Sequence, residues 1–189
     1  MATGKLIIFS APSGSGKTTI VKELLKIFPQ FEFSISATSR APRGQEQNGV
    51  DYFFLSQDEF RAKVEADEFV EWEEVYNSTC YGTLKSEMER IWSKGNVIIF
   101  DVDVMGGINL KRIFGDNARS IFIMPPSVEV LRERLIGRGT DSAETIEKRV
   151  AKAEFELSKA SEFDFVVVND ILDNAVAETE QIITDFLKR

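Results

Sequence analysis

A run of eight residues near the N-terminus has the types and spacing that bind phosphate groups. Residues 11 to 18 match the phosphate-loop pattern G-x-x-x-x-G-K-[ST], except that Ala11 stands at the first glycine. A strand-like apolar run precedes them and an amphipathic helical pattern follows, so backbone N–H groups and a helix N-terminus would point at one anion. The alanine is costly only if position 11 requires a positive φ.

The residue types in this loop suit a nucleoside triphosphate. Gly14 and Gly16 permit close approach of the backbone, Lys17 would reach the β- and γ-phosphates, and the Thr18 hydroxyl would ligate Mg²⁺. The alternative is a helix-capping turn with Lys17 in solvent, which the strand-loop-helix context disfavours. The ATP-binding residues predicted here are Ala11, Pro12, Ser13, Gly14, Ser15, Gly16, Lys17, Thr18 and Thr19.

Two aspartates follow another apolar run and extend this predicted site. Asp101 ends the run at residues 97–100, where the acid of phosphate-loop folds stands, and Asp103 follows two residues later. We predict Thr18 and Asp101 as Mg²⁺ ligands, with direct or water-mediated contact of Asp101 left open. The alternative is two acids that cap the end of a strand.

The composition limits the chemistry. In 189 residues, 23 Lys and Arg against 31 Asp and Glu give a net charge of −8, which disfavours a broad basic face for nucleic acid. No histidine and the single Cys80 exclude Ser-His and Cys-His pairs, His- or Cys-rich zinc sites and internal disulfides. No apolar run approaches the ~20 residues of a membrane span. We expect a cytoplasmic protein that works with carboxylates, hydroxyls, amides, Lys and Arg, as phosphoryl transfer does.

Apolar periodicity predicts the elements that must position these groups. Continuous apolar runs predict buried strands at residues 6–9, 97–100, 120–124 and 165–168. Helical spacing predicts helices over residues 17–28, 86–93 and 172–187. This alternation indicates an α/β fold, a parallel sheet of the P-loop NTPase type flanked by helices.

Two segments interrupt the alternation. Residues 36–84 are rich in Arg, Gly, Tyr and acids and predict a small mixed α/β insertion, and residues 127–152 are charged and helical. We therefore predict a core domain at 1–35, 85–126 and 153–189, a nucleotide-binding insertion at 36–84 and a helical lid at 127–152.

An arginine pair opens this insertion. Arg40 and Arg43 stand three residues apart around Pro42, and paired planar guanidiniums suit a phosphate monoester, although such a pair in a loop can also simply be solvated. With the motifs that follow, in order along the whole chain, the sequence strongly resembles the guanylate kinase family. The motifs are residues 11–18, Thr-Ser-Arg-Ala-Pro-Arg at 38–43, Asn-Gly-Val-Asp-Tyr-Phe at 48–53, Phe-Val-Glu-Trp at 69–72, Tyr-Gly-Thr at 81–83, Pro-Pro-Ser at 125–127, residues 134–140 and Val-Asn-Asp at 168–170.

The resemblance implies a GMP site in the insertion. The residues implied at the GMP phosphate are Arg40, Arg43, Tyr52 and Tyr81. Those implied at the guanine are Ser36, Glu71, Thr83 and Asp103. Guanine offers N1–H and N2–H donors beside the O6 acceptor, so a carboxylate accepts from one edge and a hydroxyl donates to the other. Adenine would face Glu71 with a lone pair, at a cost of about 1–3 kcal/mol or more. The alternative is that Glu71 merely belongs to the solvated acidic run 65–74.

The resemblance also implies a lid that closes over the ATP phosphates. Its arginines are Arg134, Arg138 and Arg149, which together with Lys17 and Arg40 make up the implied catalytic residues. Each lid arginine, taken singly, could instead pair with acids on a helix surface. Asn169 matches the region beside the base and ribose of ATP.

The implied activity is transfer of the γ-phosphoryl group of ATP to GMP, giving ADP and GDP in purine nucleotide metabolism, with ATP and Mg²⁺ as cofactors. The use of dGMP and the oligomeric state stay open. One alternative is a peptide-binding domain of the same fold, but such domains typically lack a working phosphate loop. Another is a kinase that phosphorylates a different phosphorylated acceptor. Only the residues implied at the guanine argue against this second alternative.

Overall fold

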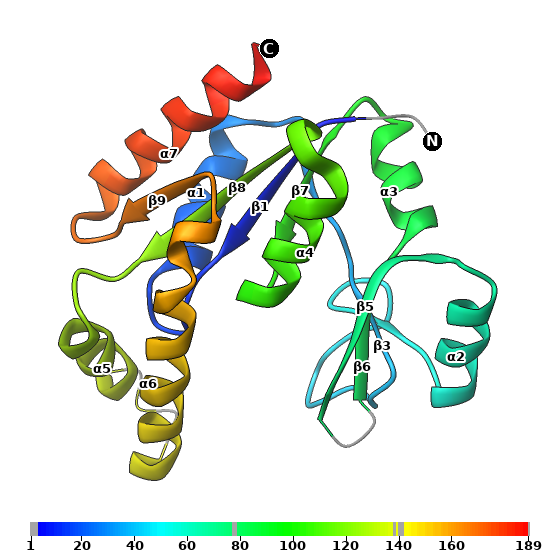
Figure 1. Cartoon of the computed structure of the whole chain (residues 1–189), viewed down its shortest axis with the longest axis horizontal. Coiled ribbons are helices and arrows are strands. Elements are labelled where there is room, and N and C mark those ends of the chain that lie inside the picture. The colour runs from blue at the N-terminus through cyan, green and yellow to red at the C-terminus, as the bar shows by residue number, and fades with distance from the viewer. Residues whose placement is uncertain (1–3, 77–78, 138, 140–141, 189) are drawn as a thin grey trace. The chain divides into compact units, whose positions relative to one another are not determined.

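The computed structural model describes residues 4–76, 79–137, 139 and 142–188. Figure 1 shows the strands and helices that follow one another along these residues. The strands are β1 (Leu6–Ser10), β2 (Phe31–Phe33), β3 (Ala37–Thr38), β4 (Phe53–Phe54), β5 (Phe69–Tyr76), β6 (Thr79–Leu84), β7 (Val97–Asp101), β8 (Ala118–Met124) and β9 (Phe165–Val168). The α-helices are α1 (Lys17–Ile27), α2 (Gln57–Glu65), α3 (Lys85–Trp92), α4 (Val104–Phe114), α5 (Val128–Gly137), α6 (Ala143–Ser158) and α7 (Leu172–Leu187).

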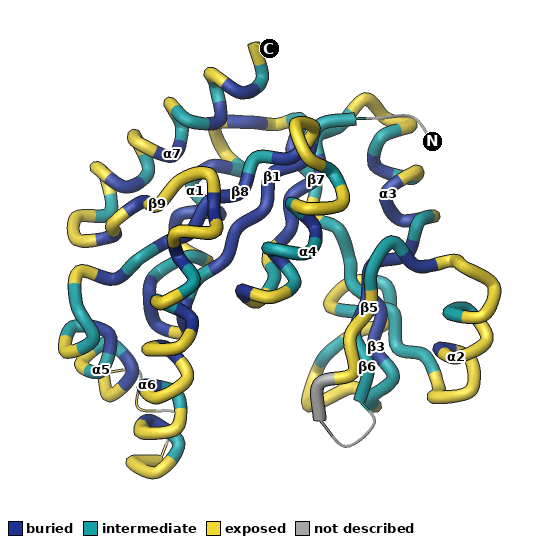
Figure 2. Tube along the Cα trace, in the orientation of Figure 1, coloured by how far each residue is buried: buried dark blue, intermediate teal, exposed yellow. Residues whose placement is uncertain are grey.

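The larger sheet has five strands in the order β2-β7-β1-β8-β9. Strand β8 pairs in parallel with β1 on one side and with β9 on the other. All five residues of β1 are buried, as Figure 2 shows for this strand, and Leu6 to Phe9 expose no surface. A strand covered on both faces needs apolar residues without alternation, which is why the run at 6–9 predicted it correctly.

The smaller sheet has four strands in the order β4-β3-β6-β5, with β5 and β3 antiparallel to β6. Side chains alternate between its faces. One face contributes Ala37 and Leu84 to a core cluster that includes Phe60 of α2. Because Thr83 and Tyr81 alternate with Leu84 and Gly82 along β6, they lie on the other face.

The chain divides into two compact units. The smaller unit comprises Glu32–Ile98 with the N-terminal residues up to Gly4, and the larger comprises Lys5–Phe31 and Ile99–Arg189. The predicted insertion lies within the range of the smaller unit and the predicted lid within that of the larger. Within the described residues no helix combines the length and apolar character needed to cross a membrane.

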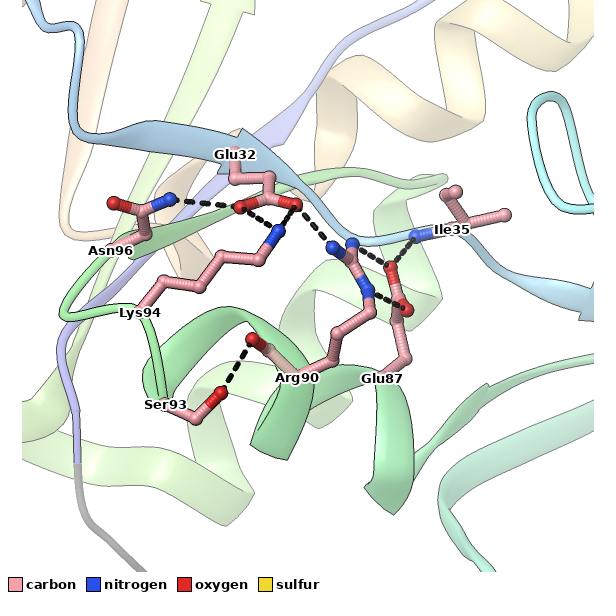
Figure 3. Close-up of polar contacts among 7 residues, drawn as sticks. All are labelled: Glu32, Ile35, Glu87, Arg90, Ser93, Lys94 and Asn96. Carbon is pink, nitrogen blue, oxygen red and sulfur yellow. Dashed lines mark hydrogen bonds and ion pairs between the residues drawn. The ribbon is translucent and has the colours of Figure 1, made fainter.

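A charged network connects β2 to α3 in the smaller unit. Figure 3 shows Arg90 between two carboxylates, those of Glu32 and Glu87. Glu87 is 3% exposed and also accepts a hydrogen bond of 3.0 Å from the backbone N–H of Ile35. The network therefore ties the segment just before β3 to α3.

The predicted α/β class with a parallel sheet is confirmed, and so are the strands and the helices expected from periodicity. The segments α2, α4 and β2 were not among the predicted elements. In α4 the pair Gly106-Gly107 lowers helix propensity. A Cβ added at Gly107 would lie 3.0 Å from the ring of Phe163, so close packing explains that glycine.

Candidate functional site

The phosphate loop of the larger unit joins β1 to α1. Gly14 and Gly16 have φ of +99° and +89°, a left-handed conformation that favours glycine. Among the described residues, only Asp67 has a positive φ without being glycine, so Ala11 needs no such freedom. Gly16 is the N-cap of α1 and provides no side-chain cap. The first N–H groups of this helix, which lack intrahelical acceptors, are therefore available to an anion.

A cavity of about 380 Å³ lies over this loop. Lys17 forms an ion pair there with Asp101, and its Nζ donates to the Val102 carbonyl oxygen at 3.4 Å. The residues that line it are Ala11 to Thr19, Asp101, Val102, Asp103, Lys152 and Glu156. The structure thus brings the predicted loop residues and both aspartates to one cavity.

Asp103 has a structural task at the start of α4. As the N-cap residue, it accepts a hydrogen bond of 2.8 Å from the Gly106 N–H through Oδ1. Its other carboxylate oxygen is not used in this cap.

Three side chains from other elements hold the phosphate loop. Asn169, only 6% exposed, donates from Nδ2 to the Ser15 carbonyl oxygen at 2.7 Å. Arg134 donates to the Ser15 carbonyl oxygen at 3.4 Å and to the Asn169 carbonyl oxygen at 3.0 Å. Arg149 donates to Ser13 Oγ at 2.8 Å. The amide of Asn169 therefore faces the loop backbone, while two predicted lid arginines contact the loop.

Arg138, predicted as the third lid arginine, lies outside the described residues. Sequence reasoning also missed Glu156, which lines the cavity from α6. This carboxylate is 7% exposed, and burial raises its pKa although Lys152 opposes the shift. A signal was present, because Glu156 continues the apolar stripe of Ile146, Val150 and Ala153.

In the smaller unit, Arg40 is the centre of a second cluster. Its guanidinium is bidentate to Glu46, with Nη1 to Oε2 at 2.6 Å and Nη2 to Oε1 at 2.8 Å. Its Nε–H donates to the Tyr81 hydroxyl oxygen at 3.1 Å. The carboxylate raises the pKa of Arg40, and Arg40, followed by the Arg43 backbone N–H, lowers the pKa of Glu46 to about 2.

The tyrosines predicted at the GMP phosphate belong to this cluster. The rings of Tyr52 and Tyr81 meet edge to face at 5.9 Å, and the Arg40 guanidinium lies 5.0 Å from the Tyr52 ring centroid. Burial raises the pKa of the Tyr52 phenol, with a further contribution from Tyr81. Arg43 is exposed, and its backbone N–H donates to Glu46 at 2.7 Å.

Glu71 and Thr83 are cross-strand neighbours in the pair of β5 and β6. The Thr83 hydroxyl donates to Glu71 Oε1 at 2.8 Å, and Thr83 exposes no surface. Continuing the register of β3 and β6 by one residue puts Ser36 opposite Thr83. The smaller unit therefore brings three of the four predicted guanine residues near one another. The fourth, Asp103, belongs to the larger unit.

Comparisons with known proteins agree on one family. The family described as "Guanylate kinase" matches residues 3–186. The chain is 57% identical over 187 residues to a guanylate kinase of Bacteroides thetaiotaomicron, covering 99% of this chain and 92% of that protein. It is 55% identical over 186 residues to a guanylate kinase of Porphyromonas gingivalis, covering 98% and 99% of the two chains. The crystal structure of guanylate kinase from Anaplasma phagocytophilum is similar, with a TM-score of 0.73, 28% identity and coverage of 98% of this chain and 87% of that one.

Proposed function

We propose how this chain, which belongs to the guanylate kinase family, divides its chemistry between two clusters of side chains. The chain is an ATP:GMP phosphotransferase and uses ATP and GMP as substrates. We assign ATP to the phosphate-loop cavity. We assign the guanine and phosphate of GMP to side chains of the smaller unit, at and beside the face of its sheet that carries Tyr81 and Thr83. The observation that carries this assignment is the phosphate loop itself, with left-handed glycines and an uncapped helix N-terminus.

The Glu71–Thr83 pair gives a physical reason for choosing guanine. The Thr83 hydroxyl donates its proton to Glu71, and Thr83 exposes no surface, so its part in guanine binding is to hold the Glu71 carboxylate. Glu71 then acts as the acceptor for the N1–H and N2–H edge of guanine. A donor to O6 must come from another group, and the Ser36 hydroxyl is our candidate. Asp103 of the larger unit, which the family resemblance also implies at the guanine, keeps one carboxylate oxygen outside its helix cap.

The GMP phosphate is assigned to Arg40, Arg43, Tyr52 and Tyr81. This group combines two cations with two phenolic O–H donors, which suits a phosphate monoester. The phosphate is mostly a dianion at neutral pH, since its second ionisation lies near pH ~6. It can therefore attack without a general base, in agreement with a chain that has no histidine.

Charge stabilisation during transfer is assigned to Lys17 and the lid arginines. Lys17 would leave its ion pair with Asp101 and bind the β- and γ-phosphates. Arg149 donates a hydrogen bond to Ser13 of the loop. Arg134 is bonded to the backbone of the loop, so in this arrangement its direct effect is on loop geometry. Arg138 keeps the role that the family resemblance implies.

The donor set around the loop fits Mg²⁺. Among the described residues, no group of three or more acidic, histidine or cysteine side chains could hold a metal alone. A hydroxyl from Thr18 and a carboxylate from Asp101 nevertheless suit Mg²⁺, which retains waters and uses few carboxylates together with substrate phosphates. Bound there, Mg²⁺ would neutralise charge on the transferred group. We further propose that the protein is cytoplasmic, because ATP and GMP are found there. We also propose that it binds neither nucleic acid nor a membrane.

Replacing Glu71 by Gln tests the guanine assignment. The amide can accept from Thr83, but its NH₂ group opposes a donor of guanine, so KM for GMP should rise about 10- to 100-fold. KM for ATP should stay within a factor of about two, since only the acceptor edge changes. A coupled assay for ADP formation, run with GMP and ATP varied in turn, measures both constants.

The matched control is Glu74→Gln, which removes the same charge from an exposed position on the same strand. It should leave both constants unchanged. An equal rise of both constants in Glu71→Gln would mean that Glu71 is not a guanine contact.

A further inference from the structure

Four of the five N–H groups of Arg40 are already bonded within the protein. Nε donates to the Tyr81 oxygen, Nη2 donates once to Glu46, and Nη1 donates to Glu46 and to the Ala41 carbonyl oxygen at 3.0 Å. A guanidinium has five N–H donors in a planar fork, so only the second N–H of Nη2 lies outside these four bonds. Arg40 also has a hydrogen-bond interaction with the Tyr52 side chain, which opposes the rise in the pKa of that phenol. Arg40 therefore cannot offer a free bidentate fork to a phosphate while Glu46 is in place.

Glu46 is also fixed by more than one hydrogen bond. Its Oε2 accepts from Arg40 and also from the Arg43 backbone N–H, at 2.6 and 2.7 Å. The Arg40 side chain is only 11% exposed, and its guanidinium also lies over the rings of Tyr52 and Phe54, at 5.0 and 5.6 Å. A phosphate that displaced the carboxylate would have to break two charge-assisted bonds to Arg40 and one to the backbone of Arg43.

The Tyr81 hydroxyl gains a defined direction from the same arrangement. Because its oxygen accepts from Arg40 Nε–H, its own proton remains available for donation to a ligand. The guanidinium of Arg40 thus positions two donors, the Tyr81 O–H and its own second Nη2–H.

We propose that Glu46 is a positioning residue for the phosphate of GMP, which is bound beside the Arg40–Glu46 pair and not in the fork of Arg40. This proposal rests on the function proposed above. The phosphate contacts are the second Nη2–H of Arg40, the Tyr81 O–H, the side chain of Arg43 and, as assigned above, the Tyr52 hydroxyl. Glu46 touches no substrate and acts by keeping the first two of these donors in place.

The arrangement also balances charge. Glu46 neutralises Arg40, so the attraction for the phosphate dianion comes mainly from the exposed Arg43. The two hypotheses for Glu46 therefore predict opposite signs. If Glu46 positions Arg40, its removal weakens GMP binding; if it competes with phosphate, its removal strengthens GMP binding.

The test is Glu46→Gln, studied by calorimetric titration of the whole chain with GMP, guanosine and ATP. The amide can accept from only one arm of the fork, so we expect GMP to bind about 10- to 100-fold more weakly. Guanosine, which lacks the phosphate, should bind as it does to the unchanged protein, and so should ATP. In steady state, KM for GMP should rise with little change in kcat.

Two further variants separate the explanations. Glu65→Gln removes one carboxylate at the exposed end of α2 and should leave GMP binding unchanged. Glu46→Asp keeps the charge with a shorter reach and should recover part of the lost affinity; it also takes over the test if Glu46→Gln does not fold.

The proposal is overturned if Glu46→Gln binds GMP as tightly as, or more tightly than, the unchanged protein, or if it weakens guanosine and GMP equally. The proposed function fails in a different way. In that case, the unchanged protein itself would bind guanosine and GMP with equal affinity.

Discussion

Asn169 illustrates how one buried amide can control a site made of backbone. Its Nδ2 donates to the Ser15 carbonyl oxygen, and a Cβ at Gly16 would clash with that nitrogen. The amide thus fixes the peptide plane between Ser15 and Gly16, two residues of the proposed ATP site. The family resemblance placed Asn169 beside the base and ribose of ATP, and its bond to Ser15 indicates in addition a positioning role toward the loop.

We expect Asn169→Asp to bind ATP at least about 10-fold more weakly, because a carboxylate oxygen would face the Ser15 carbonyl oxygen and add negative charge near the triphosphate. GMP affinity should not change. Calorimetric titration with each nucleotide measures both effects. Asn174→Asp, the same replacement at an exposed position of α7, is the control. Unchanged ATP binding in Asn169→Asp would contradict a role in the loop.

The site could be predicted from sequence only as far as motifs specify residue types. Lys17, Thr18 and Asp101 were predicted at one phosphate site, and the structure puts them at one cavity. The bonds made by Glu46 were not predictable, because an acid six residues after Arg40 in a loop has no periodicity to indicate what it binds. Tertiary contacts decide such pairings.

At the scale of elements, the network of Glu32, Arg90 and Glu87 joins β2 to α3 (Figure 3). Hydrogen bonds from Lys94, and then from Asn96 and Arg90, lower the pKa of Glu32 to about 2 although burial opposes them. A carboxyl whose pKa falls on folding stabilises the folded state above its unfolded pKa, and this stabilisation is lost as the pH falls toward the folded pKa.

Glu32→Gln should therefore lower the free energy of unfolding by about 1–2 kcal/mol at pH 7, since charge-assisted bonds become neutral ones. The difference from the unchanged protein should be constant above pH 4.5, the ordinary value, and shrink as the pH falls to about 2. Urea unfolding at several pH values measures it. A difference that grows toward acid would be the opposite of what the network requires.

Secondary structure was predictable where burial left a simple pattern. The strand β1 and the helix α7 follow from continuous apolar residues and from one apolar stripe, respectively. Strand β3 has two residues, too few for any period to appear. Helix α4 contains Gly107, which propensity disfavours and close packing against Phe163 requires.

At the scale of the whole molecule, two compact units carry the two proposed substrate sites. A ligand that binds only the folded state stabilises it by about 2.7 kcal/mol at a concentration of 100 Kd. Since the proposed sites lie in different units, each substrate should mainly stabilise its own unit, and a single two-state unfolding free energy need not describe both.

Hydrogen exchange with each nucleotide alone tests this expectation. GMP should slow exchange of backbone N–H groups in residues 69–74 and 79–84, and ATP should slow exchange in residues 11–20. UMP at the same concentration serves as the control and should protect neither segment. Protection of the phosphate loop by GMP alone would contradict the assignment of the two sites.

The contact between Gly16 and Asn169 restricts mutation at position 16 in two independent ways. An L-residue there is strained by about 1–2 kcal/mol because φ is +89°. Its Cβ would also push the Asn169 amide away from the Ser15 carbonyl oxygen. A shorter side chain at 169 relieves the second problem and leaves the first, so no single compensating change elsewhere can restore a loop that has lost this glycine.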